Sequence, residues 1–360
     1  MRKFRFILTA MAAVAGFSFI SCNNDSKDEE IKYNYTIFQK AVDDQISQNK
    51  QHDNAILLVA FGSTWQQAFD AFDATVKAYK KAFPQSDIYI SFSSAICRNQ
   101  AAAGEHADDG AEIRQYYAPD FWLHGFGAAK YKEITVQSLQ VIPGEEFANV
   151  VGDIKDFVNN KFGDLDQNYI DKGVKIKLGL PLLASVDDVY DVAEIIDDLY
   201  ADSVADGVMA FMGHGNPNDY DTYNANIRYE QLEEALQDLK PGKYYVGTVD
   251  APDNYKVQVL ERMNDDNIPD GTKVYLHPLM SIAGDHAHND MGGDDDAWED
   301  GYEENEEGEV EDTSWKSYFS HYNGFQPQSI MKGLLEISEI RQVWIDHTKD
   351  AEYFYEGAEE

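Results

Sequence analysis

The stretch AILLVAFGST, residues 55–64, decides the fold class of this chain. Its first seven residues are apolar without alternation, as in a strand that is buried on both faces. A helix-like stretch follows, in which Ala68, Phe72, Val76 and Tyr79 recur at helical spacing. A buried strand that leads directly into a helix is the repeating unit of a parallel α/β sheet.

The same pattern recurs along the chain. Six further runs are expected to form strands: 87–91, 133–141, 175–179, 207–212, 243–249 and 272–278. Helical patterns lie between most of them, and the clearest covers residues 186–199. This alternation of strands and helices predicts doubly wound parallel sheets and argues against a β-sandwich.

A weak internal repeat divides the chain into two similar halves. Two pairs of segments resemble each other: LLVAFGS (57–63) and VMAFMGH (208–214), and VQSLQVIPGEE (136–146) and LHPLMSIAGDH (276–286). The second pair aligns Glu146 with His286. We therefore predict an α/β fold of two similar domains, residues 53–183 and 184–350, whose loops face a central cleft.

The N-terminus predicts export. Three basic residues among the first five precede an apolar run over residues 6–20, which ends in a small residue before Cys22. This run is shorter than the about 20 residues of a spanning helix. We predict a signal peptide at 1–21, lipidation at Cys22 and a tether at 22–52, with the protein anchored by lipid and facing the periplasm or cell surface. With Cys22 lipidated, no intrachain disulfide forms, because Cys97 is the other cysteine of the two.

The charge of the chain restricts its partners. The formal net charge is −36, which argues against nucleic acid and against an anionic membrane surface as direct ligands. Membrane contact is thus expected through the lipid alone. Residues 294–312 hold twelve acidic side chains and no basic one, which is typical of a solvated insertion. A weak collector of divalent cations is the alternative interpretation of this segment.

Two histidine motifs indicate chemistry. His214 in FMGHGNP (211–217) and His286 in PLMSIAGDHAHND (278–290) each follow an apolar, strand-like run. Loops after strands are where open α/β sheets bind ligands, and neutral imidazole is a common metal ligand. The two residues therefore predict a metal site. His277, inside the expected strand, is interpreted as a core residue, whereas His288 is left as either a surface residue or a spare ligand.

Seven strings carry a resemblance to a known family: VAFGST, VQSLQVIPGEE, LGLPLL, FMGHGN, VGTVD, HPLMSIAGDHAHNDM and SWK. They resemble the anaerobic sirohydrochlorin cobaltochelatases, relatives of the class II chelatases that include ferrochelatase. The resemblance implies a bilobal fold with a tetrapyrrole cleft. It also implies a divalent metal substrate, Co²⁺ above all, that binds His214, Asp250 and His286, with Glu146 as a further acidic residue at the cleft.

Metal insertion explains these residue types. Two pyrrole protons must leave while the ion sheds water, so a base and a metal anchor face the same macrocycle centre. We expect His214 and His286 to bind metal and to accept protons, Asp250 to bind metal, and Glu146 to accept protons or guide the ion. Asp290 and its neighbour Asp285 are expected to orient the imidazoles.

Several alternatives remain at this stage. Asp250 stands where the family is expected to carry glutamate, and a lipid anchor is unusual for a step of anaerobic cobalamin biosynthesis in the cytosol. The main hypothesis is a metal chelatase, a lyase that acts on sirohydrochlorin. The alternative is an exported lipoprotein that binds haem or another tetrapyrrole for capture, transport or metal removal. A periplasmic metal buffer is a third hypothesis, and a homo-oligomer stays open.

Overall fold

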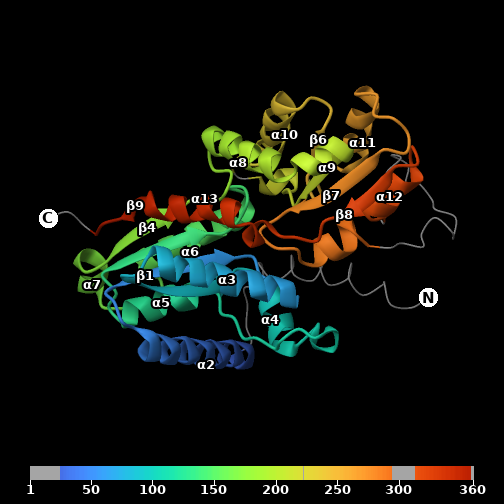
Figure 1. Cartoon of the computed structure of the whole chain (residues 1–360). Coiled ribbons are helices and arrows are strands. Elements are labelled where there is room, and N and C mark those ends of the chain that lie inside the picture. The colour runs from blue at the N-terminus through green and yellow to red at the C-terminus, as the bar shows by residue number, and fades with distance from the viewer. Residues whose placement is uncertain (1–24, 222, 294–312, 358–360) are drawn as a thin grey trace. The chain divides into compact units, whose positions relative to one another are not determined.

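The computed structural model describes residues 25–221, 223–293 and 313–357, and the chain forms two units, Met1–Ala41 and Val42–Glu360 (Figure 1). The predicted signal peptide, Cys22 and the acidic insertion 294–312 lie outside the described residues. Helix α2 (Asp25–Asn49) runs from the first unit into the second. Within the described part of the chain, every helix is too short or too polar to cross a membrane.

The first sheet has five strands in the order β2-β1-β3-β4-β9. Its strands are β1 (Asn54–Ala60), β2 (Ser86–Phe92), β3 (Glu133–Ser138), β4 (Lys175–Gly179) and β9 (Glu352–Tyr355). The first four are parallel, and β9 pairs antiparallel with β4. The helices that accompany this sheet are α3 (Gln66–Ala82), α4 (Ala95–Ala103), α5 (Pro119–Ala128), α6 (Glu145–Val158), α7 (Gln167–Lys172) and α13 (Ser338–Lys349).

The second sheet has four parallel strands in the order β6-β5-β7-β8. They are β5 (Val208–Gly213), β6 (Tyr244–Thr248), β7 (Lys273–Leu279) and β8 (Gln326–Ser329). Its helices are α8 (Val186–Leu199), α9 (Ala201–Asp206), α10 (Ile227–Leu239), α11 (Lys256–Asp265) and α12 (Trp315–His321).

Both faces of the second sheet are covered, which explains why its strands are apolar throughout. Along β5, Met209 and Phe211 pack into a core shared with α8 and α10. Val208, Ala210 and Met212 pack into a separate core with α11 and α12. A strand buried on both sides needs an apolar residue at every position, and this is the pattern that the sequence displays.

The predicted duplication is confirmed by topology. In each sheet the parallel strands stand in the same order: second, first, third and fourth along the chain. Strand β3 begins at Glu133 and β7 at Lys273, which is the same offset that aligned Glu146 with His286. All seven predicted strands are present, each within a few residues of its expected bounds. The α/β fold of two similar doubly wound sheets is therefore confirmed.

The C-terminal boundary of the second half differs from the prediction. In Figure 1 the red α13 and β9 lie beside the green β4 of the first sheet. Trp344 of α13 is fully buried in the core that also contains residues of α3. Residues 338–355 thus complete the first sheet instead of ending a domain 184–350. Helix periodicity shows which face is apolar and carries no information on which sheet receives it.

The predicted tether 22–52 also needs correction at its end. Residues up to Asn49 are helical, and Val42 and Ile46 are buried. Ile46 lies so close to Gly125 of α5 that a Cβ atom there would meet its side chain at 2.6 Å. The segment from Val42 onward is therefore part of the packed unit and not a linker.

Candidate functional site

The candidate site residues follow strands of both sheets. His214 comes directly after β5, Asp250 two residues after β6, and His286 follows β7 by one short loop. Because β6, β5 and β7 are neighbours and parallel, their carboxyl ends meet at one edge of the sheet. The structure thus brings together the three residues that the resemblance named. Glu146 reaches the same cavity from the first turn of α6.

The two imidazoles lie edge to face. Their ring centroids lie 4.9 Å apart at an angle of 83°. Nδ1 of His214 lies 2.8 Å from the carbonyl oxygen of Gly215, and Nδ1 of His286 lies 2.7 Å from Oδ2 of Asp290. A carbonyl and a carboxylate oxygen only accept, so both Nδ1 atoms donate. In the neutral ring the lone pair is then on Nε2, which is the nitrogen available to a metal ion.

Asp250 occupies a different position from the one expected of a ligand. Its Oδ2 lies 3.5 Å from Nδ1 of His214, on the side of the ring that carries the proton. Its backbone N–H donates to the carbonyl oxygen of His214 at 2.8 Å. Among the described residues no three His, Cys, Asp or Glu side chains are already arranged to hold a metal ion. The ligand set His214, Asp250 and His286 therefore stays a prediction, one that requires the Asp250 side chain to turn.

The environment separates the pKa values of the two histidines. Burial and the neighbouring His286 lower the pKa of His214, and Asp250 only partly offsets this. Burial also opposes protonation of His286, yet the hydrogen bond and charge of Asp290 outweigh it and raise the pKa. His214 is thus the neutral imidazole at neutral pH, whereas His286 retains a proton more readily.

Glu146 is suited to exchange a proton. Burial raises the pKa of its carboxyl group, and the charge of Glu145 adds to this effect. The hydroxyl of Ser93 donates to Oε2 of Glu146 at 2.7 Å and opposes the shift. A carboxylate with a raised pKa accepts a proton near neutral pH more readily than an exposed one does.

The cavity that joins these residues has a volume of about 190 Å³. Its walls come from both halves and include Phe61, Ser63, Gln140, Glu146, His214 and His286. Ligand pockets typically measure roughly 300–1,000 Å³. The cavity is therefore smaller than a typical ligand pocket.

Trp65 is a residue of the site that sequence reasoning did not connect with it. Its indole Nε1 donates to Oδ1 of Asp285 at 2.6 Å, and its ring stacks on His288 at 3.7 Å between centroids. The ring also stacks on His106 at 4.1 Å between centroids. Trp65 belongs to the first half, so it fixes the loop that carries His286 from the opposite side of the cleft. In the sequence, its position directly after the 62–64 loop was the one indication that Trp65 lies near the site.

His277 is a core histidine, as predicted. It is fully buried, and its Nε2 accepts from the hydroxyl of Tyr200 at 2.6 Å. Its Nδ1 donates to the carbonyl oxygen of Pro278 at 3.0 Å. Burial lowers the pKa of His277 to about 4. His288 is half-buried and stacks on Trp65, and its assignment as a spare ligand stays a prediction.

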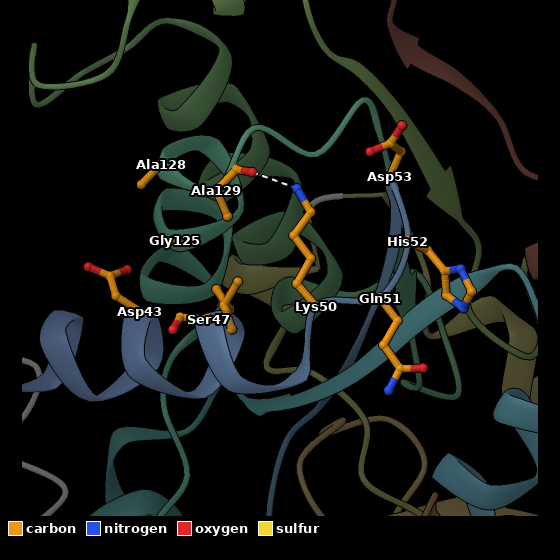
Figure 2. A pocket seen from close by; sticks show the side chains of 10 residues that line it. Asp43, Ser47, Lys50, Gln51, His52, Asp53, Gly125, Ala128 and Ala129 are labelled. Carbon is orange, nitrogen blue, oxygen red and sulfur yellow. Dashed lines mark hydrogen bonds between the residues drawn. The ribbon is translucent and has the colours of Figure 1, made fainter.

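A larger hollow of about 870 Å³ lies at the end of α2, and neither His214 nor His286 lines it (Figure 2). Lys50 extends across it, and its Nζ donates to the carbonyl oxygen of Ala129 at 2.6 Å. Asp53 pairs with Lys132 at 2.6 Å. Lys50 and Asp53 thus both bond within the protein.

Comparison with known proteins identifies the family of the chain. The model of the family described as cobalt chelatase (CbiK) matches residues 54–353. A sirohydrochlorin cobaltochelatase CbiKC from Nitratidesulfovibrio vulgaris is 27% identical over 295 residues, which cover 81% of this chain and 88% of the relative. A sirohydrochlorin cobaltochelatase from Salmonella typhimurium is 24% identical over 303 residues, 82% of this chain and 96% of the relative.

The fold has a solved counterpart. The structure of SirB from Bacillus subtilis with Fe³⁺ has a TM-score of 0.51 and 12% sequence identity. The match covers 82% of this chain and 94% of that one. At this identity the likeness concerns the fold alone.

Proposed function

Because the chain belongs to the cobalt chelatase (CbiK) family, we propose that it is a metal chelatase that inserts Co²⁺ into sirohydrochlorin. One observation carries the proposal: two imidazoles 4.9 Å apart leave both Nε2 atoms available, in a cavity that also contains a buried carboxyl group. The relatives named above are sirohydrochlorin cobaltochelatases, and the match covers more than four fifths of this chain. Co²⁺ is the metal substrate here, not a resident cofactor.

The geometry assigns separate roles to the two halves. Nε2 of His214 and of His286 bind the incoming ion, and imidazole suits Co²⁺ as a borderline ligand. Glu146 faces the cavity from the first half and accepts a pyrrole proton, for which its raised pKa is appropriate. The second proton passes to Nε2 of the neutral His214 once the ion has left that nitrogen for the macrocycle. The carboxylate of Asp250 stabilises the charge that His214 acquires in either role.

The test is metal insertion followed by absorbance of the tetrapyrrole. A small amount of protein is added to excess sirohydrochlorin and Co²⁺ without oxygen, and many turnovers per protein are expected. His214→Ala and His286→Ala should each abolish insertion, and Glu146→Gln should slow it. His124→Ala is a matched control, because His124 also pairs with an aspartate at 2.7 Å. Wild-type turnover in both histidine variants would show that the reaction does not take place in this cavity.

The sequence at the N-terminus favours a second function. We propose export and lipid anchoring from the signal-like residues 1–21 and from Cys22, which suits a carrier that captures a tetrapyrrole outside the cytosol. A carrier holds its ligand at one equivalent per site, whereas an enzyme metallates an excess. Stoichiometric binding without turnover would favour the carrier.

A further inference from the structure

Gln140 is a buried residue of the cavity wall whose main chain is held in place. It lies in the loop between β3 and α6, lines the cavity and is only 8% exposed. Its carbonyl oxygen accepts from the backbone N–H of Leu182 at 3.1 Å and from the indole Nε1 of Trp344 at 3.3 Å. Two distant segments thus hold its main chain in place.

Ser138 holds Gln140 by two hydrogen bonds. The hydroxyl of Ser138 accepts from the Gln140 backbone N–H at 3.3 Å and donates its own proton to Oε1 of the side chain. The carbonyl end of the amide is therefore satisfied. Its Nε2 has no hydrogen-bond partner in the described part of the protein. A buried donor without an acceptor costs free energy, so a ligand with an acceptor is favoured here.

The charge around the cavity indicates which acceptor this is. Sirohydrochlorin carries acetate and propionate arms, which are anionic at neutral pH. None of the described residues that line the cavity is Lys or Arg, and Glu146 and Asp285 are acidic. A carboxylate arm that enters the cavity therefore meets N–H and O–H donors in place of Lys or Arg. A space of about 190 Å³ admits such an arm but not the macrocycle.

We propose that Nε2 of Gln140 binds the carboxylate of one peripheral acid arm of the tetrapyrrole and thereby sets the orientation of the ring over the two histidines. This inference rests on the proposed function and specifies its substrate as a tetrapyrrole with a free acid arm. Gln140 is a specificity residue in this role. It touches neither the metal nor a pyrrole proton.

The test compares Gln140→Leu and Gln140→Glu with the wild type. A hydrogen bond to a charged group is worth about 10- to 100-fold in binding, so Gln140→Leu should raise KM for sirohydrochlorin within that range. Gln140→Glu should raise KM further, because it places a second carboxylate against the first. In both variants kcat should stay within about threefold, and the Kd of Co²⁺ from calorimetry should be unchanged.

The methyl ester of sirohydrochlorin separates a carboxylate contact from general damage. The wild type should prefer the acid to the ester, and Gln140→Leu should lose most of that preference. Equal losses for acid and ester, or an unchanged KM for the acid, would overturn the proposal. A higher Kd for Co²⁺ in either variant would also overturn it, because it would show that Gln140 contributes to metal binding.

Failure of the proposed function is distinguishable from failure of this inference. If the wild type does not metallate sirohydrochlorin, the same acid and ester are titrated without metal and read by absorbance. A preference for the acid that depends on Gln140 then supports the contact in a carrier, and no preference refutes it. Ser138→Ala, which frees Oε1, should give a smaller loss than Gln140→Leu in either assay.

Discussion

The carboxylate of Asp290 should control both the strength and the pH dependence of metal binding by His286. Its Oδ2 accepts from Nδ1 of His286 at 2.7 Å, which directs Nε2 into the cavity. Asp290→Ala removes the acceptor and the charge. Asp290→Asn retains an acceptor of the same shape and removes only the charge.

The magnitude follows from the contact and its exposure. Loss of a partner that orients a metal-binding histidine typically costs 10- to 100-fold in metal affinity. The side chains of His286 and Asp290 are 35% and 46% exposed, so water screens the pair and the lower end of that range applies. We expect Asp290→Ala to lower the affinity for Co²⁺ about tenfold. A charge-assisted hydrogen bond is roughly twice as strong as a neutral one, so Asp290→Asn should lower the affinity for Co²⁺ about threefold.

The effect should diminish in acid. Asp290 raises the pKa of His286, and Co²⁺ must displace the proton from the imidazole. In the wild type, affinity therefore begins to fall as the pH drops below this raised pKa. Without Asp290 the pKa is lower, and the fall begins at a lower pH. The ratio of wild-type to variant affinity is thus largest above neutral pH and decreases towards acid.

Calorimetric titration of Co²⁺ between pH 6 and pH 8.5 measures both quantities. Asp164→Ala is the matched control, because Asp164 pairs with His124 at the same 2.7 Å and is 52% exposed. The control should leave the affinity unchanged at every pH. Equal affinities of Asp290→Ala and the wild type would refute the orientation of His286. A ratio that grows in acid would refute the assignment of the raised pKa.

Three further outcomes are expected. Trp65→Phe, which keeps the stacking and loses the hydrogen bond to Asp285, should lower kcat by roughly two- to tenfold, and Trp65→Ala should lower it further; equal activity in all three proteins would show that the lobes need no such contact. The ion pair of His347 with Asp188 raises the pKa of His347 against its burial, so its stabilisation is complete below the unfolded pKa of about 6.5 and is lost as the pH rises through the folded value. His347→Gln should therefore lower Tm by a few degrees at pH 6 and by less at pH 9 in thermal scans. Cys22→Ser should release the protein from the membrane fraction without loss of chelatase activity, and unchanged partitioning would contradict the lipid anchor.

The sequence alone determined the two sheets and the position of the histidines. A parallel strand buried on both faces requires an unbroken apolar run, and this requirement is local, so 55–61 and 208–212 could be identified without the fold. The repeat within the chain then predicted which strand ends face each other. His214 and His286 follow such strands, and the structure places their rings 4.9 Å apart.

Only the tertiary structure decided the contacts between distant segments. Trp65 bonds to Asp285, and α13 and β9 return to the first sheet, because packing selects among many apolar surfaces that look alike in sequence. The unpartnered Nε2 of Gln140 is likewise invisible in the sequence, since it depends on the hydrogen bond to Ser138 and on the described residues that line the cavity. Periodicity records which residues avoid water, and the partner of each residue is fixed only when the whole chain packs.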